Sequence, residues 1–91
     1  MNDQDALPCV IVPTRYAGTY EGGRWVAFPA ELTDIVGGDW QAGDPWAAPW
    51  WHKYGSSVGV GNTPQEAYEA LKAIPAERRW SPASSGFTKG L

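Results

Sequence analysis

The sequence predicts one small α+β domain with a three-stranded antiparallel sheet, or a four-stranded one if residues 9–12 join it, and one helix packed across a face. Three observations lead to this prediction. Residues 64–74 have the spacing and the end signals of an amphipathic helix, residues 14–28 have those of a β-hairpin, and 91 residues suffice for only one core. The expected order is strand, strand, strand, helix, with a long Trp-rich loop between the second and third strands.

Both ends of the chain are expected to be flexible, so the folded domain is predicted to span residues 9–75. Residues 1–8 are polar and end in Pro8, and residues 76–91 are rich in Ser, Gly and Pro. One helical turn is expected within 75–80. Arg78 and Arg79, placed in this tail, are expected to be solvated charges.

Residues 9–12 predict a short buried strand, because Cys-Val-Ile-Val is apolar, is mostly β-branched and lies between two prolines. Cys9 is expected to be buried and inert within it. Pro13 limits how far the strand's ladder of hydrogen bonds extends.

Residues 14–28 predict a β-hairpin that turns at Gly22 and Gly23, since consecutive glycines supply the positive φ angles of a two-residue turn. In this register Tyr20 faces Trp25. One face would then carry Gly18, Tyr20, Trp25 and Ala27, and the other would carry Ala17, Thr19, Val26 and Phe28. The first face is favoured to lie under the helix, with the second left as the alternative core.

Residues 29–53 lack a sustained period and are dense in turn formers, which predicts a long loop. They contain four of the six tryptophans of the chain. Because Trp is enriched in binding hot spots, the expected partner-binding residues are Trp40, Trp46, Trp50, Trp51, Asp39 and Asp44. At least one of Trp50 and Trp51 is expected to be exposed, since neighbours in an extended segment point in opposite directions. The alternative is a loop folded back as a small core.

The helix at 64–74 has the clearest signals in the chain. Thr63 is placed to accept a hydrogen bond from the backbone of Glu66, whose side chain reaches back to Thr63, and Pro64 suits the first helical position. Ala67, Leu71 and Ile74 form an apolar stripe that has to lie on another apolar surface. Before it, residues 54–60 predict the third strand, with Val58 and Val60 on one face.

Charge and composition narrow the classes of partner. The formal charge of −3 and the pI of 4.9 disfavour nucleic acid. No apolar run approaches a membrane span, and the start of the chain lacks the features of a signal peptide, so a cytoplasmic protein is expected. No cofactor is expected. A homodimer through open sheet edges is a further expectation.

Candidate catalytic and metal-ligating groups are few. His52, the single histidine, lacks a companion at a diagnostic spacing, and an enzyme would need it to meet a carboxylate or Cys9 in a cleft. Asp34, Asp39 and Asp44 do not match the spacing of a calcium loop. Gly59 and Gly61 lack the lysine of a phosphate-binding loop, so helix capping explains them better.

Two segments resemble a known family. Residues 24–29, Arg-Trp-Val-Ala-Phe-Pro, and residues 59–71, with Gly-Asn-Thr-Pro-Gln-Glu-Ala, are similar to the second strand and the helix start of the HicB-like antitoxin domain. Small phage and prophage proteins share these features. The resemblance implies a partial double-stranded-RNA-binding-like fold and a role in occluding a toxin ribonuclease. This chain departs from the family in lacking a DNA-binding pattern after Ile74 and in its insertion at 29–53.

The sequence therefore favours a non-enzymatic intracellular protein of phage type that binds another protein through an acidic, Trp-rich loop. A HicB-like antitoxin that neutralises a basic ribonuclease is the first alternative. A binder of carbohydrate or another small ligand, using the tryptophans with Asp39 and Asp44, is the second.

Overall fold

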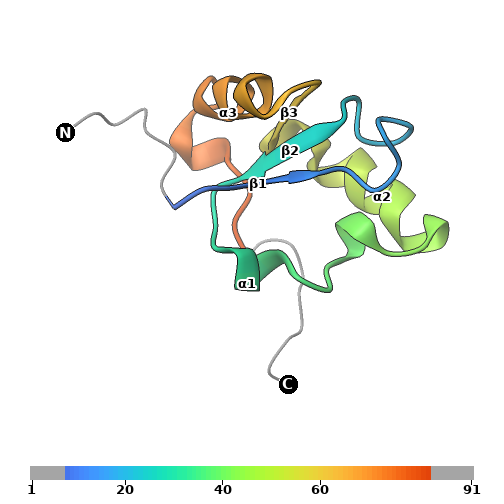
Figure 1. Cartoon of the computed structure of the whole chain (residues 1–91). Coiled ribbons are helices and arrows are strands. Elements are labelled where there is room, and N and C mark those ends of the chain that lie inside the picture. Colours follow the sequence, from blue (N-terminus) through green and yellow to red (C-terminus); the bar gives the residue numbers. More distant parts are fainter. Residues whose placement is uncertain (1–7, 83–91) are drawn as a thin grey trace.

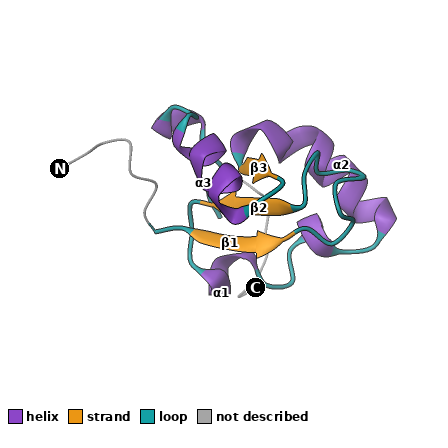
Figure 2. Ribbon diagram, turned by 45° about the horizontal axis from the view of Figure 1, so that its top comes forward, coloured by secondary structure: helices purple, strands orange, loops and turns teal. Residues whose placement is uncertain are grey.

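The computed structural model describes residues 8–82, and this part of the chain has an α+β fold with a three-stranded antiparallel sheet (Figure 1). The strands are β1 (Val10–Pro13), β2 (Trp25–Phe28) and β3 (Gly59–Gly61), and Figure 2 shows β2 between the other two. The helices are α1 (Leu32–Ile35), α2 (Asp44–Tyr54) and α3 (Pro64–Lys72). Short 3₁₀ turns are η1 (Asp39–Gln41), η2 (Gly55–Ser57) and η3 (Ala76–Arg78).

The strand predicted at residues 9–12 is confirmed as β1, which is one of the three strands of the sheet. β1 pairs antiparallel with β2, in a register that places Val10 opposite Phe28 and Val12 opposite Val26. β2 also pairs antiparallel with β3, with Ala27 opposite Gly59. Residues 14–24 form no strand, so the predicted hairpin over residues 14–28 with its turn at Gly22 and Gly23 is wrong.

Residues 14–24 instead form a long connection between β1 and β2, held by the buried side chain of Glu21. Its two carboxylate oxygens accept hydrogen bonds from the backbone N–H groups of Tyr16 and Gly18, each at 3.0 Å. Ala17 has a φ of 54°, which a strand does not allow. Thr14 closes the connection, since its N–H donates to the Arg24 carbonyl at 2.9 Å. Glu21 thus satisfies backbone groups that a hairpin would have paired across strands.

The segment 29–53 is not a long loop, because it contains α1, η1 and most of α2. Helix α2 begins after Gly43, with Asp44 and Pro45 in its first turn, where a carboxylate and a missing N–H are both tolerated. Pro49 lies inside the helix and removes one of its hydrogen bonds. Burial of Ala47, Trp50 and Trp51 from the same helix offsets that loss.

The two faces of the sheet pack against different clusters of side chains. On one face, Ala27 meets Ala67 and Leu71 of α3. The other face carries the larger, Trp-rich cluster, whose buried members are Val26, Phe28, Ala30, Ile35, Trp40, Ala47, Trp50, Trp51, Val58 and Trp80. Val60 packs against this cluster, so Val58 and Val60 share it as the alternation predicted.

The predicted helix is confirmed as α3, which ends at Lys72 rather than at residue 74. The N–H of Glu66 donates to Thr63 Oγ1 at 3.1 Å, as the capping box requires. The return bond is shifted by one residue, since Glu66 Oε1 accepts from the N–H of Asn62 at 2.9 Å. These two hydrogen bonds therefore hold the first turn of α3 against the residues that directly follow β3.

The folded part of the chain continues past residue 75. Trp80 is 2% exposed and belongs to the Trp-rich cluster, and η3 supplies the single turn expected before it. Arg79 is not a solvated charge, because its guanidinium donates to the carbonyl of Lys72, the last residue of α3, and to that of Ile74. The predicted flexible ends fall largely on residues 1–7 and 83–91, which lie outside the described residues.

Candidate functional site

The four tryptophans of the 29–53 segment have very different exposures. Trp40, Trp50 and Trp51 are each 4% exposed, whereas Trp46 is 59% exposed. Trp40 donates its indole N–H to the Ile35 carbonyl at 2.8 Å, and Trp51 donates to the Trp40 carbonyl at 2.9 Å. Three of the four predicted partner-binding rings are therefore part of the core.

The expectation that Trp50 or Trp51 would be exposed is wrong because it assumed an extended backbone. In a helix, consecutive side chains are about 100° apart, so both rings fit within one broad apolar side of α2. The two rings contact each other edge to face, with centroids 5.0 Å apart. This side of α2 rests on Phe28, whose ring centroid is 6.1 Å from that of Trp50.

A shallow hollow of about 240 Å³, called here the Trp46 groove, lies along α2 beside the exposed indole. The residues that line it are Asp39, Pro45, Trp46, Pro49, Trp50, Lys53 and Tyr54. The Lys53 ammonium lies 5.2 Å from the centroid of the Tyr54 ring, in cation–π geometry. The structure thus brings together three of the predicted residues, Asp39, Trp46 and Trp50. The groove combines aromatic rings and prolines with the carboxylate of Asp39 and the ammonium of Lys53.

Asp44 is not among the residues of the Trp46 groove. Its carboxylate interacts with the phenols of Tyr16 and Tyr20, in the connection between β1 and β2. The pKa of Tyr16 is raised, first by partial desolvation and then by a hydrogen bond with Asp44. The pKa of Tyr20 is raised by partial desolvation and by the same negative charge. The Tyr16 hydroxyl donates to the Ala42 carbonyl at 2.6 Å, so this connection is attached to the chain just before α2.

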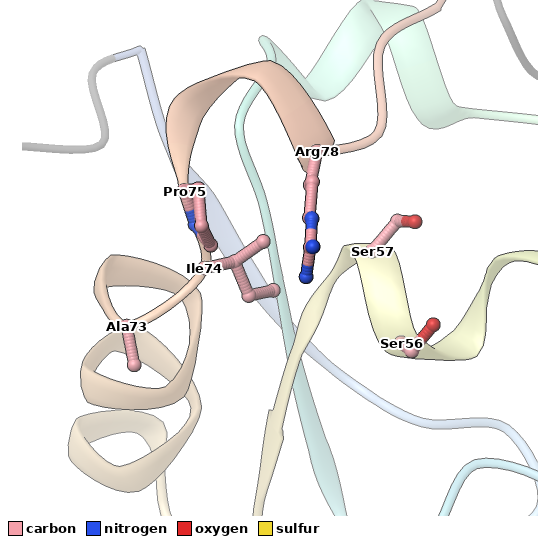
Figure 3. A pocket seen from close by; sticks show the side chains of 6 residues that line it. All are labelled: Ser56, Ser57, Ala73, Ile74, Pro75 and Arg78. Atoms are coloured by element: carbon pink, nitrogen blue, oxygen red, sulfur yellow. The ribbon is translucent and has the colours of Figure 1, made fainter.

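A second hollow, called here the Arg78 pocket, has a volume of about 460 Å³ and lies between the end of α3 and η2 (Figure 3). Ala73, Ile74 and Pro75 form its apolar wall, Ser56 and Ser57 lie opposite, and Arg78 completes it. Figure 3 shows the Arg78 side chain extending from η3 between Ile74 and Ser57. The sequence placed Arg78 in a tail. The apolar Trp80 two residues later was the signal that this segment returns to the core.

The groups considered for catalysis are in different parts of the molecule. Cys9 is half-buried and packs on the cluster under α3, and burial raises the pKa of its thiol. His52 is exposed on α2, whose buried residues belong to the Trp-rich cluster. Within residues 8–82, no three His, Cys, Asp or Glu side chains are grouped as a metal site would require.

The described helices contain no segment with the length and apolarity needed to cross a membrane. Comparisons with protein-family models, with curated proteins and with solved structures find no match for this chain. The resemblance to the HicB-like domain consequently remains a prediction.

Proposed function

We propose that this protein is a small, non-enzymatic intracellular module that binds another protein through the Trp46 groove. The observation that supports the proposal is the contrast among four neighbouring tryptophans. Three are sealed at 4% exposure, while Trp46 stays 59% exposed next to a groove. An indole left in water forgoes the burial energy that its three neighbours gain, and a partner surface would supply it.

The position of Trp46 on α2 favours tight contacts. The helix is held in place by the buried rings of Trp50 and Trp51, so the groove keeps its shape without a partner. Binding then costs little ordering of the backbone, which is the usual advantage of a preorganised site. The Trp46 side chain has only two rotatable bonds to fix.

The chemistry of the groove indicates the kind of surface that fits it. Trp46, Trp50 and Tyr54 offer ring faces and edges, with Pro45 and Pro49 between them, so an apolar side chain or a proline of the partner would fill the hollow. Asp39 is exposed at this groove and would pair with a basic side chain next to that apolar one. The net charge of −3 favours approach of a basic partner.

The test uses two substitutions of exposed apolar residues. Trp46→Ala removes the proposed anchor, and Leu32→Ala on α1 removes a side chain that is similarly exposed, at 54%. A hot-spot tryptophan costs about 2 kcal/mol on truncation, which is about thirtyfold in affinity. The wild-type chain and both variants would serve as baits in its native host, and the affinity of each captured protein would then be measured with purified components.

We expect Trp46→Ala to lose the partner while Leu32→Ala keeps it, with both variants retaining the thermal midpoint of the wild type. Equal affinity of the wild type and Trp46→Ala for every captured protein would rule out this groove as the binding surface. Adding the purified partner to chain labelled with ¹⁵N would show whether the signals of α2 are the ones that shift.

A HicB-like antitoxin is the second candidate. Its support is the set of three antiparallel strands with α3 contacting β2 and β3, together with the acidic charge. A small basic ribonuclease encoded next to this protein would be the expected partner. Inhibition of that ribonuclease by an equimolar amount of the wild-type chain supports this candidate, and undiminished RNA cleavage eliminates it.

A further inference from the structure

We propose that the Arg78 pocket binds a small anionic ligand, in which a carboxylate or phosphate is attached to a short apolar group. This site shares no residue with the Trp46 groove and does not depend on the function proposed above. The inference combines three features of the pocket: an arginine whose guanidinium has no partner within residues 8–82, an apolar wall and two serines opposite that wall.

The state of Arg78 is the first feature. Within residues 8–82 its guanidinium makes no hydrogen bond and no ion pair, although it extends over the hollow. The adjacent Arg79 differs, since it donates to the carbonyls of Ile74 at 2.9 Å and Lys72 at 3.3 Å. No carboxylate is found among the described residues that line the pocket. The planar donor fork of Arg78 therefore remains available for a carboxylate or a phosphate.

The walls of the pocket are the second feature. Its volume of about 460 Å³ falls within the range of roughly 300–1,000 Å³ that is usual for small-molecule sites. Ala73, Ile74 and Pro75 would contact an apolar group of the ligand, with Ser56 and Ser57 on the opposite side of the hollow. A bare ion would leave the apolar wall in water, so an anion with an apolar substituent fits better.

The end of α3 would by itself oppose an anion, because the last carbonyls of a helix carry partial negative charge. In this molecule Arg79 binds two carbonyls at that end, and its positive charge lies next to that of Arg78 in the chain. The charge of Arg79 therefore compensates part of the negative charge of those carbonyls, while the full positive charge of Arg78 lines the pocket.

The experiment is an NMR titration of the full chain with phenyl phosphate, benzoate and the neutral benzamide. We expect saturable shifts of the backbone signals of Ser56, Ser57 and Ala73 with at least one anion and not with benzamide. The two anions separate the sources of the ligand, since a phosphate site prefers phenyl phosphate and a carboxylate site prefers benzoate. Shifts of equal size with benzamide, or no saturable shift with either anion, would overturn the proposal.

Two arginine substitutions test the role of the guanidinium. Arg78→Gln removes the charge in the pocket, whereas Arg24→Gln removes an exposed arginine that is not among the residues lining it. Because Arg78→Gln loses a charge-assisted hydrogen bond, we expect it to bind the anion with about tenfold lower affinity than the wild type does. We expect Arg24→Gln to bind as the wild type does. Equal affinities of the two variants would show that Arg78 does not hold the anion, and their amide spectra would confirm that both are folded.

Discussion

The two faces of the sheet use opposite means of packing, although both depend on the four residues of β2. Ala27 faces α3, where its neighbours are Ala67 and Leu71. Val26 and Phe28 face the other way, into a cluster that contains four tryptophans. The first face lets backbones approach closely, and the second fills a wide space with rings. Because successive side chains of β2 point to opposite faces of the sheet, this one strand contributes to two cores that are packed differently.

The closeness of α3 to the sheet follows from the glycines of β3. A Cβ atom added to Gly59 would lie 2.1 Å from the Ala67 carbonyl oxygen and 2.4 Å from the Leu71 nitrogen, both in the backbone of α3. On the other face the Phe28 ring lies 5.1 Å from the Trp40 ring and 5.2 Å from the Trp80 ring, between centroids. We therefore expect the α3 face to be intolerant of added atoms and the Trp-rich face to be intolerant of removed ones.

The largest expected effect is removal of the central ring of the Trp-rich face. Phe28 is 0% exposed and touches three tryptophan rings. Phe28→Ala should lower the free energy of unfolding by about 4 kcal/mol, because it loses buried area and leaves a cavity among rings that cannot all close in. Urea denaturation, monitored by tryptophan fluorescence, measures this loss in the free energy of unfolding. Phe28→Leu, which keeps most of the volume, should cost less than half as much.

The opposite change tests the α3 face. Gly59→Ala should cost about 3 kcal/mol or more, because the added methyl group meets backbone atoms that can move only if α3 shifts. Gly55→Ala is the matched control, since Gly55 has a helical φ of −59° and its added Cβ would lie 3.6 Å from Trp51, an ordinary contact. The control should be neutral or slightly stabilising in the same denaturation experiment. Similar losses at the two glycines would refute the close-approach account.

The smallest expected effect compares two rings within the Trp-rich face. Trp51 donates its indole N–H to the Trp40 carbonyl, whereas the buried N–H of Trp50 has no acceptor among the described residues. Trp51→Phe should therefore cost about 1 kcal/mol more than Trp50→Phe, since only the first change breaks a buried hydrogen bond. Thermal unfolding of the two variants gives the difference. An equal or larger loss for Trp50→Phe would refute the stabilising role of the Trp51 hydrogen bond.

The local signals in the sequence were reliable where one short segment carried all of them. The α3 helix was predicted from Thr63, Pro64 and Glu66, and the strand at residues 9–12 from its β-branched run. The hairpin at 14–28 failed because Glu21 binds backbone groups inside the connection, an interaction that alternation does not reveal. The α2 helix was missed because Pro45 and Pro49 suggested turns.

The candidate site was predicted only in part for the same reason. The segment that contains the tryptophans was predicted to be a long loop, which led to the expectation that its rings would be available together. In the structure only Trp46 is well exposed among the four, and Asp44 interacts with tyrosines instead of lining the groove. The Arg78 pocket joins residues 56–57 to residues 73–78, a pairing for which the sequence contains no local signal.

The sequence by itself determined the α+β class, the amphipathic α3 with its cap, the strand near residues 9–12 and the acidic, Trp-rich composition. These properties depend on residues within a few positions of each other, where backbone preference and spacing act directly. The tertiary structure alone decided which strands pair, which indoles are buried and where the two hollows lie. Those outcomes depend on contacts between distant segments, such as Trp80 with Phe28, whose energies exceed the weak local preferences of the residues involved.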